Sequence, residues 1–420
     1  MDKSNLDVAV IGGGAAGIAA AHYLSRRHRV DLYEADSEAG GHVQTVRAEE
    51  NGSSLAVDMG FIVFNNRNYP CFTRLMKELG VESSPTVMSF SYSELKTGFA
   101  YSGHSLSGLF ASRKNFINPR FWSMLIQIKR FNSQVLEDLK AGRLKDITLG
   151  DYVRGHGFTR ILFMRYLIPM VQSIWSAEEK AADDFPMVRF AEFFANHGLL
   201  SLKDRPEWMF IKGGSFTYVQ AFKKAFQGRL LLGSPVQGVS RQDSGPVVHL
   251  KDGDVKYQTV VLACHADAAL GLLRSPEEAQ VRLLSPWQYE DNEVCLHTDE
   301  SFLPPNKRSW ACWNYIAGAG KRPEKVNVHY YMNMLQDFQA GHNYVVTLNP
   351  ESRPDQAKVQ RCLNMAHPRF TRQALKAQAG IRSIQGRGGI YYCGSYHGNG
   401  FHEDAMASGV RAAQMLGVEP

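Results

Sequence analysis

Three glycines near the start of the chain have the spacing that brings a backbone close to phosphate. They are Gly12, Gly14 and Gly17, arranged as Gly-x-Gly-x-x-Gly. The first permits a tight turn, the second close approach to a pyrophosphate, and the third the packing of a helix on a sheet. Glu34 follows 22 residues after Gly12, where a carboxylate can bind a ribose diol and disfavours a 2′-phosphate. The pattern predicts a dinucleotide site.

The elements around these glycines distinguish such a site from an ordinary glycine-rich turn. Residues 7–11 are an apolar run that predicts a strand, 15–27 predict an alanine-rich helix, and 29–34 predict a second strand. Strand, glycine turn and helix then form one βαβ unit, whose free helical N–H groups face the phosphates. Ala15 and Ala16 in the first helical turn, and Ala35 beside Glu34, are predicted to contact the same cofactor.

A second group of small residues favours FAD over NAD. Gly41 and His42 lie in a further glycine turn, and Gly60 and Phe61 follow soon after. A cofactor that carries an isoalloxazine ring needs backbone approach beyond the pyrophosphate, and these glycines permit it. An ordinary turn would explain each pair taken alone. Together they predict contacts to FAD at all four residues.

The chain resembles the flavin-containing amine oxidase and phytoene desaturase superfamily over nearly its whole length. The likeness is carried by the N-terminal glycines with Glu34, by a middle segment from Gly213 to Ala266, and by residues 391–409. It implies non-covalent FAD, with the adenine at the backbone of Val236. It also implies a set of flavin contacts near the C-terminal end of the chain: Gly394, Ser395, Phe401, His402, Asp404 and Ala405.

This resemblance, with the alternation of strand-rich and helix-rich segments, predicts an α/β protein of amine oxidase-like two-domain architecture. A Rossmann-type FAD-binding domain holds an inserted α+β substrate domain. The predicted FAD-binding domain comprises residues 1–90, 205–275 and 385–420, and the predicted substrate domain comprises residues 91–204 and 276–384.

Three positions depart from the superfamily pattern. His42 stands where an arginine is usual, so less fixed positive charge faces the pyrophosphate. Ser395 stands where an acidic residue is common and hydrogen-bonds more weakly. Phe401 stands where amine oxidases often place a tyrosine beside the flavin, which removes one feature expected for an amine substrate.

Within the superfamily the chain resembles a bacterial branch whose members accompany cyclopropane-type fatty-acid methyltransferases. The matching stretches are residues 60–65, 313–315, 332–336 and 400–404. That resemblance implies an FAD-dependent oxidoreductase that dehydrogenates or desaturates an apolar lipid or acyl-chain substrate by hydride transfer to flavin N5. Two alternatives stay open: a flavin amine oxidase, and a flavin-bound partner protein of a lipid methyltransferase.

Two histidines flank the glycine-rich loop expected at the flavin. His397 and His402 are candidate catalytic proton carriers, because imidazole titrates near neutral pH. The alternative is a histidine held by a backbone hydrogen bond. Glu403 and Asp404 can likewise simply cap the final helix. No partner with metal-ligand spacing accompanies the histidines, so a metal site is not expected.

Two further apolar patterns admit both a structural and a functional interpretation. Phe163, Leu167, Met170 and Ile174 have helical spacing and indicate either core or a substrate channel. Basic residues also surround an aromatic-rich stretch, which indicates either a solvated helix face or a patch for anionic lipid. The residues of this patch are Arg113, Lys114, Phe116, Arg120, Phe121, Trp122, Ile126, Lys129 and Arg130.

Composition limits the remaining possibilities. The net charge of +6 is scattered, and no nucleic-acid module is present in the sequence. The six cysteines lie far apart without a CxxC, so neither disulfides nor zinc are expected, and a reducing cytoplasm is the simplest compartment. We find no signal peptide and no membrane-spanning stretch. We expect a cytoplasmic protein, with peripheral contact at the inner membrane surface as an open alternative.

Overall fold

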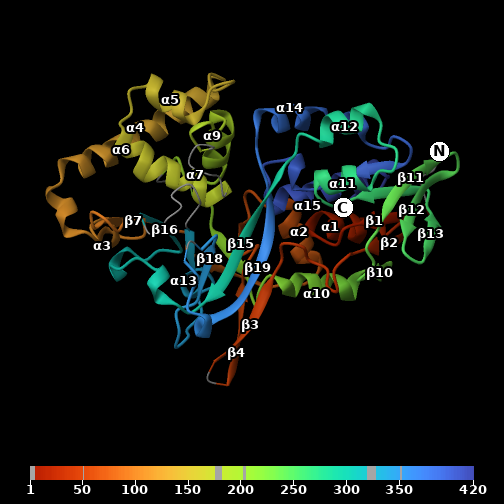
Figure 1. Ribbon diagram of the computed structural model, residues 1–420, viewed down its shortest axis with the longest axis horizontal. Coiled ribbons are helices and arrows are strands. Elements are labelled where there is room, and N and C mark those ends of the chain that lie inside the picture. The colour runs from red at the N-terminus through yellow and green to blue at the C-terminus, as the bar shows by residue number, and fades with distance from the viewer. Residues whose placement is uncertain (1–4, 51, 176–181, 202–204, 319–327, 351) are drawn as a thin grey trace.

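A parallel five-stranded sheet forms the centre of one half of the molecule, on the right of Figure 1. The structure is a computed structural model that describes residues 5–50, 52–175, 182–201, 205–318, 328–350 and 352–420. The strands follow the order β10-β2-β1-β14-β20. Their bounds are Arg229–Leu231 for β10, Arg29–Tyr33 for β2, Asp7–Ile11 for β1, Thr259–Leu262 for β14 and Ile390–Tyr392 for β20.

Both faces of this sheet are covered, which explains why its strands are almost wholly apolar. One face packs against α1 (Ala15–Leu24), α2 (Pro70–Glu78), α10 (Phe216–Ala225) and α15 (His402–Met415). The opposite face packs against four groups of elements: α11 (Ala266–Leu272), α12 (Glu278–Leu284), α14 (Arg372–Gly380), and the small sheet of β11 (Gly238–Gln242), β12 (Gly245–Leu250) and β13 (Gly253–Lys256).

The predicted strand–turn–helix–strand unit is confirmed. The helix is shorter than expected, because it ends at Leu24 and residues 25–28 form the turn into β2. The positions of α12 and α14 were not anticipated. Both belong to the segment assigned to the substrate domain, yet Leu283 and Ala374 lie in the same core as Ala9 of β1.

A mixed seven-stranded sheet forms the second half of the molecule, in the order β19-β15-β18-β17-β16-β7-β8. Its strand β7 pairs in parallel with β16, which joins parts of the chain that are over 200 residues apart. The bounds are Val359–Pro368 (β19), Tyr289–His297 (β15), Val345–Leu348 (β18), Val328–Tyr331 (β17), Trp313–Ala317 (β16), Phe90–Glu94 (β7) and Phe99–Ser102 (β8).

Polar side chains occupy one row across all seven strands. Each member of the row is the direct cross-strand partner of the next, so the row fixes one register for the sheet. Thr347 hydrogen-bonds to the buried His329 and His297, and Ser91 donates to Asn314. In strand order the row consists of Cys362, Cys295, Thr347, His329, Asn314, Ser91 and Ser102.

A helical lobe covers this sheet, at the upper left of Figure 1. Its core is built from large buried aromatic side chains such as Phe131, Phe190 and Phe194. The stretch with the helical spacing of Phe163, Leu167, Met170 and Ile174 contains a π-helical turn, so its apolar residues do not form a single α-helical stripe. The elements are α3 (Leu106–Leu109), η1 (Arg113–Ile117), α4 (Pro119–Lys140), α5 (Leu149–Gly155), α6 (Arg160–Leu162), the π-helix (Phe163–Leu167), α7 (Ile168–Trp175) and α9 (Met187–Asn196).

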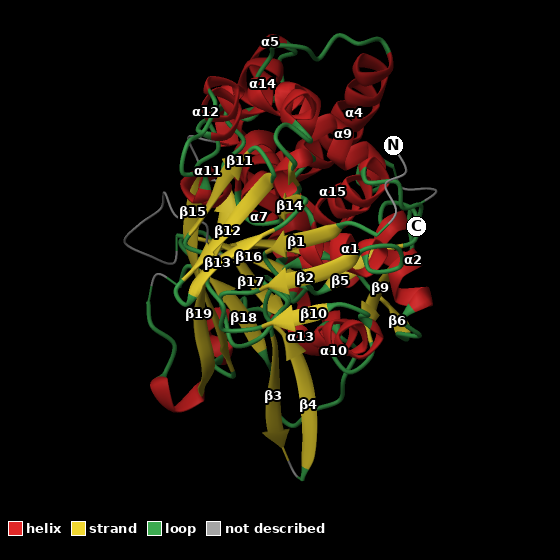
Figure 2. Cartoon of the chain, turned by 90° about the vertical axis from the view of Figure 1, so that its right-hand side faces the viewer, coloured by secondary structure: helices red, strands yellow, loops and turns green. Residues whose placement is uncertain are grey.

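Smaller elements complete the fold. In Figure 2 the helices gather at the top, and the hairpin of β3 (Thr45–Glu50) and β4 (Ser53–Asp58) projects at the bottom. A three-stranded sheet has the order β5-β9-β6. The remaining bounds are Val63–Asn65 (β5), Ser83–Thr86 (β6), Trp208–Ile211 (β9), Met332–Leu335 (α13), and the 3-10 turns Glu300–Phe302, Lys307–Ser309, Gln356–Lys358, Ile381–Ile384 and Ser395–His397.

One expectation about the cysteines is wrong. Cys295 of β15 and Cys362 of β19 are direct cross-strand partners and form a disulfide, although 67 residues separate them. Their spacing carries no signal, because the sheet and not the sequence makes them neighbours. Among the described residues, no helix is both long enough and apolar enough to cross a bilayer.

Candidate functional site

The two predicted glycine turns meet at the C-terminal edge of the parallel sheet. Gly12 and Gly14 lie in the turn between β1 and α1, and Gly17 lies in the first turn of α1. The N–H of Gly40 donates to the carbonyl oxygen of Gly13 at 2.8 Å, which holds the second turn, with Gly41, against the first. Ala15 and Ala16 begin α1. Ligands of parallel α/β sheets bind at this edge.

The space at this turn fits a pyrophosphate. A Cβ on Gly14 would meet no atom within 4 Å, so this stretch of backbone faces open space. A Cβ on Gly17 would instead lie 1.8 Å from the carbonyl oxygen of Gly12, so only glycine permits the packing there. The first turn of α1 has no acidic side chain and no side-chain cap. Its N–H groups therefore remain available to an anion.

Glu34 ties the end of β2 to the glycine turn. Its carboxylate accepts hydrogen bonds from the N–H of Gly13 at 2.7 Å and of Asp36 at 2.9 Å. The N–H of Ser234 donates to the backbone oxygen of Glu34 at 2.8 Å, which brings the segment containing Val236 beside Glu34 and Ala35. The ribose and adenine contacts predicted from distant parts of the sequence thus lie in one place.

The C-terminal segment closes the site from the other side. The N–H of Gly394, just after β20, donates to the hydroxyl of Ser408 at 2.8 Å, and that hydroxyl donates to the oxygen of Ala405. Helix α15 packs on α1 so closely that a Cβ on Gly409 would lie 2.2 Å from the oxygen of Ala16. The carbonyl of Ser395 accepts from the N–H of Gly398 and Gly400, which keeps the loop between β20 and α15 compact.

His402 is anchored on the FAD-binding side. Its imidazole stacks on Phe61 with ring centroids 3.7 Å apart, and its Nε2 hydrogen-bonds to the hydroxyl of Tyr218 at 3.0 Å. Phe61 follows Gly60, and its N–H donates to the oxygen of His42 at 3.1 Å. Burial lowers the pKa of His402 to about 3. The side chain is therefore neutral at pH 7.

His397 is also held neutral. Its Nε2 is buried and has no hydrogen-bond partner. Burial, and next the charge of Arg411, lower the pKa of His397 to about 3. A proton carrier works best with a pKa near the operating pH, so these environments weigh against that role. The assignment of His397 and His402 to catalysis stays a prediction.

Both carboxylates at the start of α15 are engaged by backbone groups. Glu403 accepts from the N–H of Cys71 at 2.8 Å and of Phe72 at 2.9 Å, which joins α15 to the start of α2. Asp404 accepts from the N–H of Phe401 at 2.9 Å. Burial raises the pKa of each carboxyl group. Both groups thus have a structural task at the start of α15.

His42 lies in a group of three imidazoles. Its Nε2 is 3.1 Å from the carbonyl oxygen of Ala366, and its ring centroid is 5.4 Å from that of His367 and 6.1 Å from that of His265. Burial, followed by the two neighbouring histidines, lowers the pKa of His42 to about 3. The superfamily's arginine is thus replaced by a neutral ring whose position is set by β19.

Phe401 forms part of an aromatic wall between α15 and the helical lobe. Its ring centroid lies 4.7 Å from that of Phe193 and 6.3 Å from that of Trp175. Trp175 ends α7, and the same helix carries the buried Gln172, whose oxygen accepts from the Tyr315 hydroxyl on β16 at 2.8 Å. Helix α7 therefore connects the wall to the seven-stranded sheet.

Asp58 carries more hydrogen bonds than Glu403 or Asp404, and no motif in the sequence pointed to it. This fully buried side chain accepts from the N–H and hydroxyl of Ser215, from the Thr45 hydroxyl and from the Gln336 amide. Burial raises the pKa of Asp58 to about 7. Asp58 is the last residue of β4, and its hydrogen bonds link this strand both to the segment before α10 and to the end of α13. An acidic residue inside the apolar run 55–59 is the sequence signal that could have drawn attention to it.

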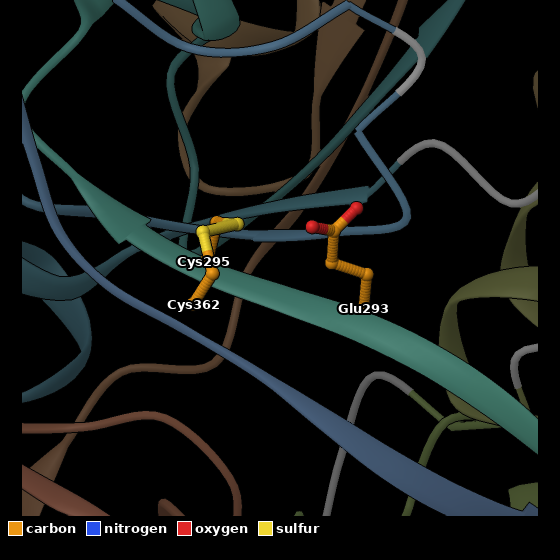
Figure 3. A group of neighbouring side chains, drawn as sticks. All are labelled: Glu293, Cys295 and Cys362. Atoms are coloured by element: carbon orange, nitrogen blue, oxygen red, sulfur yellow. A yellow bond between two sulfur atoms is a disulfide. The ribbon is translucent and has the colours of Figure 1, made fainter. Parts of the chain in front are cut away.

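One group of described residues has atoms close enough to suggest a metal site. Figure 3 shows Glu293, Cys295 and Cys362, whose ligand atoms lie within 4.8 Å of one another. The two sulfurs are bonded to each other, and Glu293 pairs with Arg353. A disulfide sulfur is not a thiolate ligand. This group therefore gives no reason to place a metal in the site.

Comparison with known proteins supports the assignment of a flavin site. The family model described as flavin containing amine oxidoreductase matches residues 15–339. The AofH protein of Mycobacterium tuberculosis, a flavin-containing monoamine oxidase by name, is 27% identical over 277 residues, which cover 61% of this chain and 56% of that protein. The chain thus spans about half the length of the curated relatives it matches.

Two solved structures share the fold over almost their full length. Cyclohexylamine oxidase from Brevibacterium oxydans is 15% identical, covers 98% of both chains and gives a TM-score of 0.69. A CLA-producing fatty acid isomerase from P. acnes is 14% identical, covers 99% of both chains and gives a TM-score of 0.68. The predicted amine oxidase-like α/β architecture is confirmed. Because an amine enzyme and a fatty-acid enzyme match equally well, the fold leaves the substrate open.

Proposed function

The chain belongs to the flavin-containing amine oxidoreductase family, and we propose that it uses non-covalently bound FAD to dehydrogenate or desaturate an apolar, acyl-chain substrate. It is a flavin-dependent oxidoreductase. We assign the pyrophosphate to the turn of Gly12 and Gly14 and the first turn of α1 with Gly17, the ribose to Glu34, and the flavin to the segment from Gly394 to Ala405. The open space at Gly14 and the uncapped start of α1 support this assignment.

The observation that carries the substrate proposal is the engagement of both carboxylates beside the flavin segment. Glu403 and Asp404 are satisfied by backbone N–H groups. An ammonium substrate placed there would meet no free counter-charge and would have to be desolvated without compensation. A hydrocarbon chain has no such cost, and Phe401, Phe193 and Trp175 offer it an apolar wall.

When bound, the flavin supplies the acceptor for a hydride from a substrate C–H bond. In total the flavin would take up one hydride and one proton, the two hydrogens that leave adjacent substrate carbons when a C=C bond forms. The residues of this chain then have three tasks. The aromatic wall of Phe401, Phe193 and Trp175 positions the acyl chain of the substrate and excludes water. The Tyr218–His402–Phe61 contacts fix the start of α15, and the neutral His42 adds no fixed charge beside the cofactor.

An amine oxidase is the second candidate function. The relative named as a monoamine oxidase favours it, because its similarity is one of sequence, at 27% identity, whereas the fatty acid isomerase matches by fold at 14% identity. A third possibility is that the chain binds flavin but serves as a partner of a lipid methyltransferase. This possibility rests on the resemblance to the bacterial branch described above.

Anaerobic reduction of the purified holoprotein tests these proposals. Oleate and phosphatidylglycerol vesicles are the acyl probes, and benzylamine and putrescine are the amine probes. We expect acyl probes to bleach the visible flavin absorbance and amines to leave it unchanged. Bleaching by amines alone would refute the acyl proposal in favour of amine oxidation. Bleaching by neither, with a methyltransferase co-purifying, would favour the partner function.

A further inference from the structure

An unusual concentration of exposed apolar side chains lies at one end of the helical lobe. We call residues 106–126 the α3–α4 tip; it comprises α3, η1 and the first turns of α4, at the left-hand end of Figure 1. Five of the nine large hydrophobic residues that are exposed in the described part of the chain fall within it. They are Leu106 (79% exposed), Phe116 (54%), Ile117 (85%), Trp122 (44%) and Ile126 (68%). Contiguous exposed apolar residues mark interaction sites.

Contacts among neighbouring residues hold these exposed side chains in place. Phe110 stacks on Phe116 at 4.0 Å, and the Trp122 indole N–H donates to the carbonyl of Phe116 at 3.0 Å. Phe121, which the sequence pattern grouped with the patch, is instead fully buried against the sheet. One side of α4 is therefore core, and the other carries exposed apolar side chains.

The charge around the tip has a single sign. From residue 95 to residue 136 the chain contains no aspartate or glutamate and six lysines or arginines. All six are exposed: Lys96, Arg113, Lys114, Arg120, Lys129 and Arg130. Arg113, Lys114 and Arg120 form no ion pair with any described residue. Exposed apolar side chains ringed by unpaired cations are the pattern of an interfacial membrane segment.

A cavity opens beside the same helix. It has a volume of about 780 Å³, and its walls include Arg120, Arg160, Arg165, Ile161 and Met164. Arg165 is paired with Glu94 at 2.8 Å, whereas Arg120 and Arg160 have no acidic partner among the described residues. Two free guanidinium groups above an apolar floor suit a phosphate attached to hydrocarbon.

The alternatives to a lipid surface fit less well. A second copy of the chain, docked tip to tip, would bring Arg113, Lys114 and Arg120 against the same three cations. A protein partner would have to supply both an apolar face and a dense acidic rim. A bilayer containing anionic phospholipid supplies both an apolar interior and a surface of anionic phosphates.

We propose that the α3–α4 tip docks on a membrane surface rich in anionic phospholipid. Leu106, Ile117 and Ile126 enter the interfacial layer, and Arg113, Lys114 and Arg120 pair with lipid phosphates. The contact is peripheral and independent of the redox substrate. If the protein oxidises amines instead of acyl chains, the tip docks in the same way.

Vesicle flotation of the holoprotein tests the docking surface. We expect the wild type to float with vesicles of phosphatidylglycerol and phosphatidylcholine, and to float at least tenfold less with phosphatidylcholine alone. The triple variant Arg113→Gln, Lys114→Gln, Arg120→Gln should weaken binding about a hundredfold, since each cation near the surface contributes about a fivefold step. Raised salt should weaken the wild type in the same direction.

The apolar contribution is tested separately. The variant Leu106→Ser, Ile117→Ser, Ile126→Ser should bind at least tenfold more weakly, with the visible flavin spectrum and melting temperature unchanged because these side chains are exposed. The matched control is Val281→Ser with Met415→Ser, which removes two exposed apolar side chains elsewhere. Equal flotation of wild type and both tip variants would overturn the proposal. So would a tip variant that converts a dimer into a monomer without any wild-type binding to vesicles.

Discussion

The two halves of the molecule are held by different kinds of contact. In the FAD-binding half the closest contacts join main-chain atoms, as where Gly17 packs on Gly12 and Gly409 packs on Ala16. In the substrate half the contacts join side chains, as in the polar row across seven strands and the aromatic core of the lobe. Main-chain contacts leave no room for an added atom, whereas side-chain packing tolerates changes of similar volume. Substitutions that add atoms should therefore destabilise the FAD-binding half more than the substrate half.

The largest effect should come from Gly17→Ala. The added Cβ would lie 1.8 Å from the oxygen of Gly12, so α1 must move away from the sheet. We expect loss of bound flavin and destabilisation of at least about 4 kcal/mol, measured by visible absorbance and thermal unfolding. The matched control is Gly14→Ala, whose Cβ meets nothing within 4 Å. It should keep the melting temperature of the FAD-free protein yet lower the affinity for FAD. Equal melting temperatures for both variants would contradict the comparison.

Asp58→Ala should have the next largest effect. The change leaves buried donors of Thr45, Ser215 and Gln336 without their acceptor, at a cost of about 3 kcal/mol. Tyr315→Phe in the substrate half removes one hydrogen bond, to Gln172, and should cost about 1 kcal/mol. Urea unfolding of both variants measures the difference. A larger loss for the tyrosine variant would reverse the expected order.

Acidification should weaken both halves to a similar extent. Burial lowers the pKa of His402 in the first half and of His329 in the second to about 3. The unfolded chain binds protons below about pH 6.5 that the folded chain does not, so stability falls as the pH falls from 6.5 toward 3. One unit below 6.5, each histidine contributes about 1.4 kcal/mol to this loss.

Melting temperatures between pH 7 and pH 5 measure this loss. His402→Asn and His329→Asn should each flatten the dependence, and His104→Gln, at an exposed position, is the control. A steeper dependence in either buried variant would show that its histidine is charged in the folded protein.

Phe401→Tyr should have the smallest effect on stability. The ring is only half-buried, so an added hydroxyl can reach solvent and should change the free energy of unfolding by less than about 0.5 kcal/mol. If the apolar wall is what disfavours amines, benzylamine should reduce the bound flavin of the variant a few-fold faster than that of the wild type. Anaerobic flavin bleaching measures this rate, and an unchanged rate would remove Phe401 from the explanation of substrate choice.

The sequence predicts what short motifs determine and misses what long-range pairing determines. Gly12, Gly14, Gly17 and Glu34 lie within one βαβ unit, so their meeting follows from local geometry. The junction of Gly394–Ala405 with that unit was implied by family resemblance. Asp58 was missed because its partners come from residues 45, 215 and 336, and the disulfide because β15 and β19 become neighbours only in the sheet. The orientations of His397 and His402 depend on burial, which a pattern of residue types does not contain.

The strand order of the parallel sheet determines when each strand can pair during synthesis of the chain. β1 lies at the centre, but its partner β14 follows about 250 residues later, and β20 and α15 come later still. At about 5–20 residues per second, ribosomal synthesis leaves one apolar edge of β1 unpaired for roughly 10 to 50 seconds. During that time the nascent chain carries an open strand that can pair with other chains. Yield in the cell should therefore depend on chaperones that hold this segment until the cofactor pocket can close.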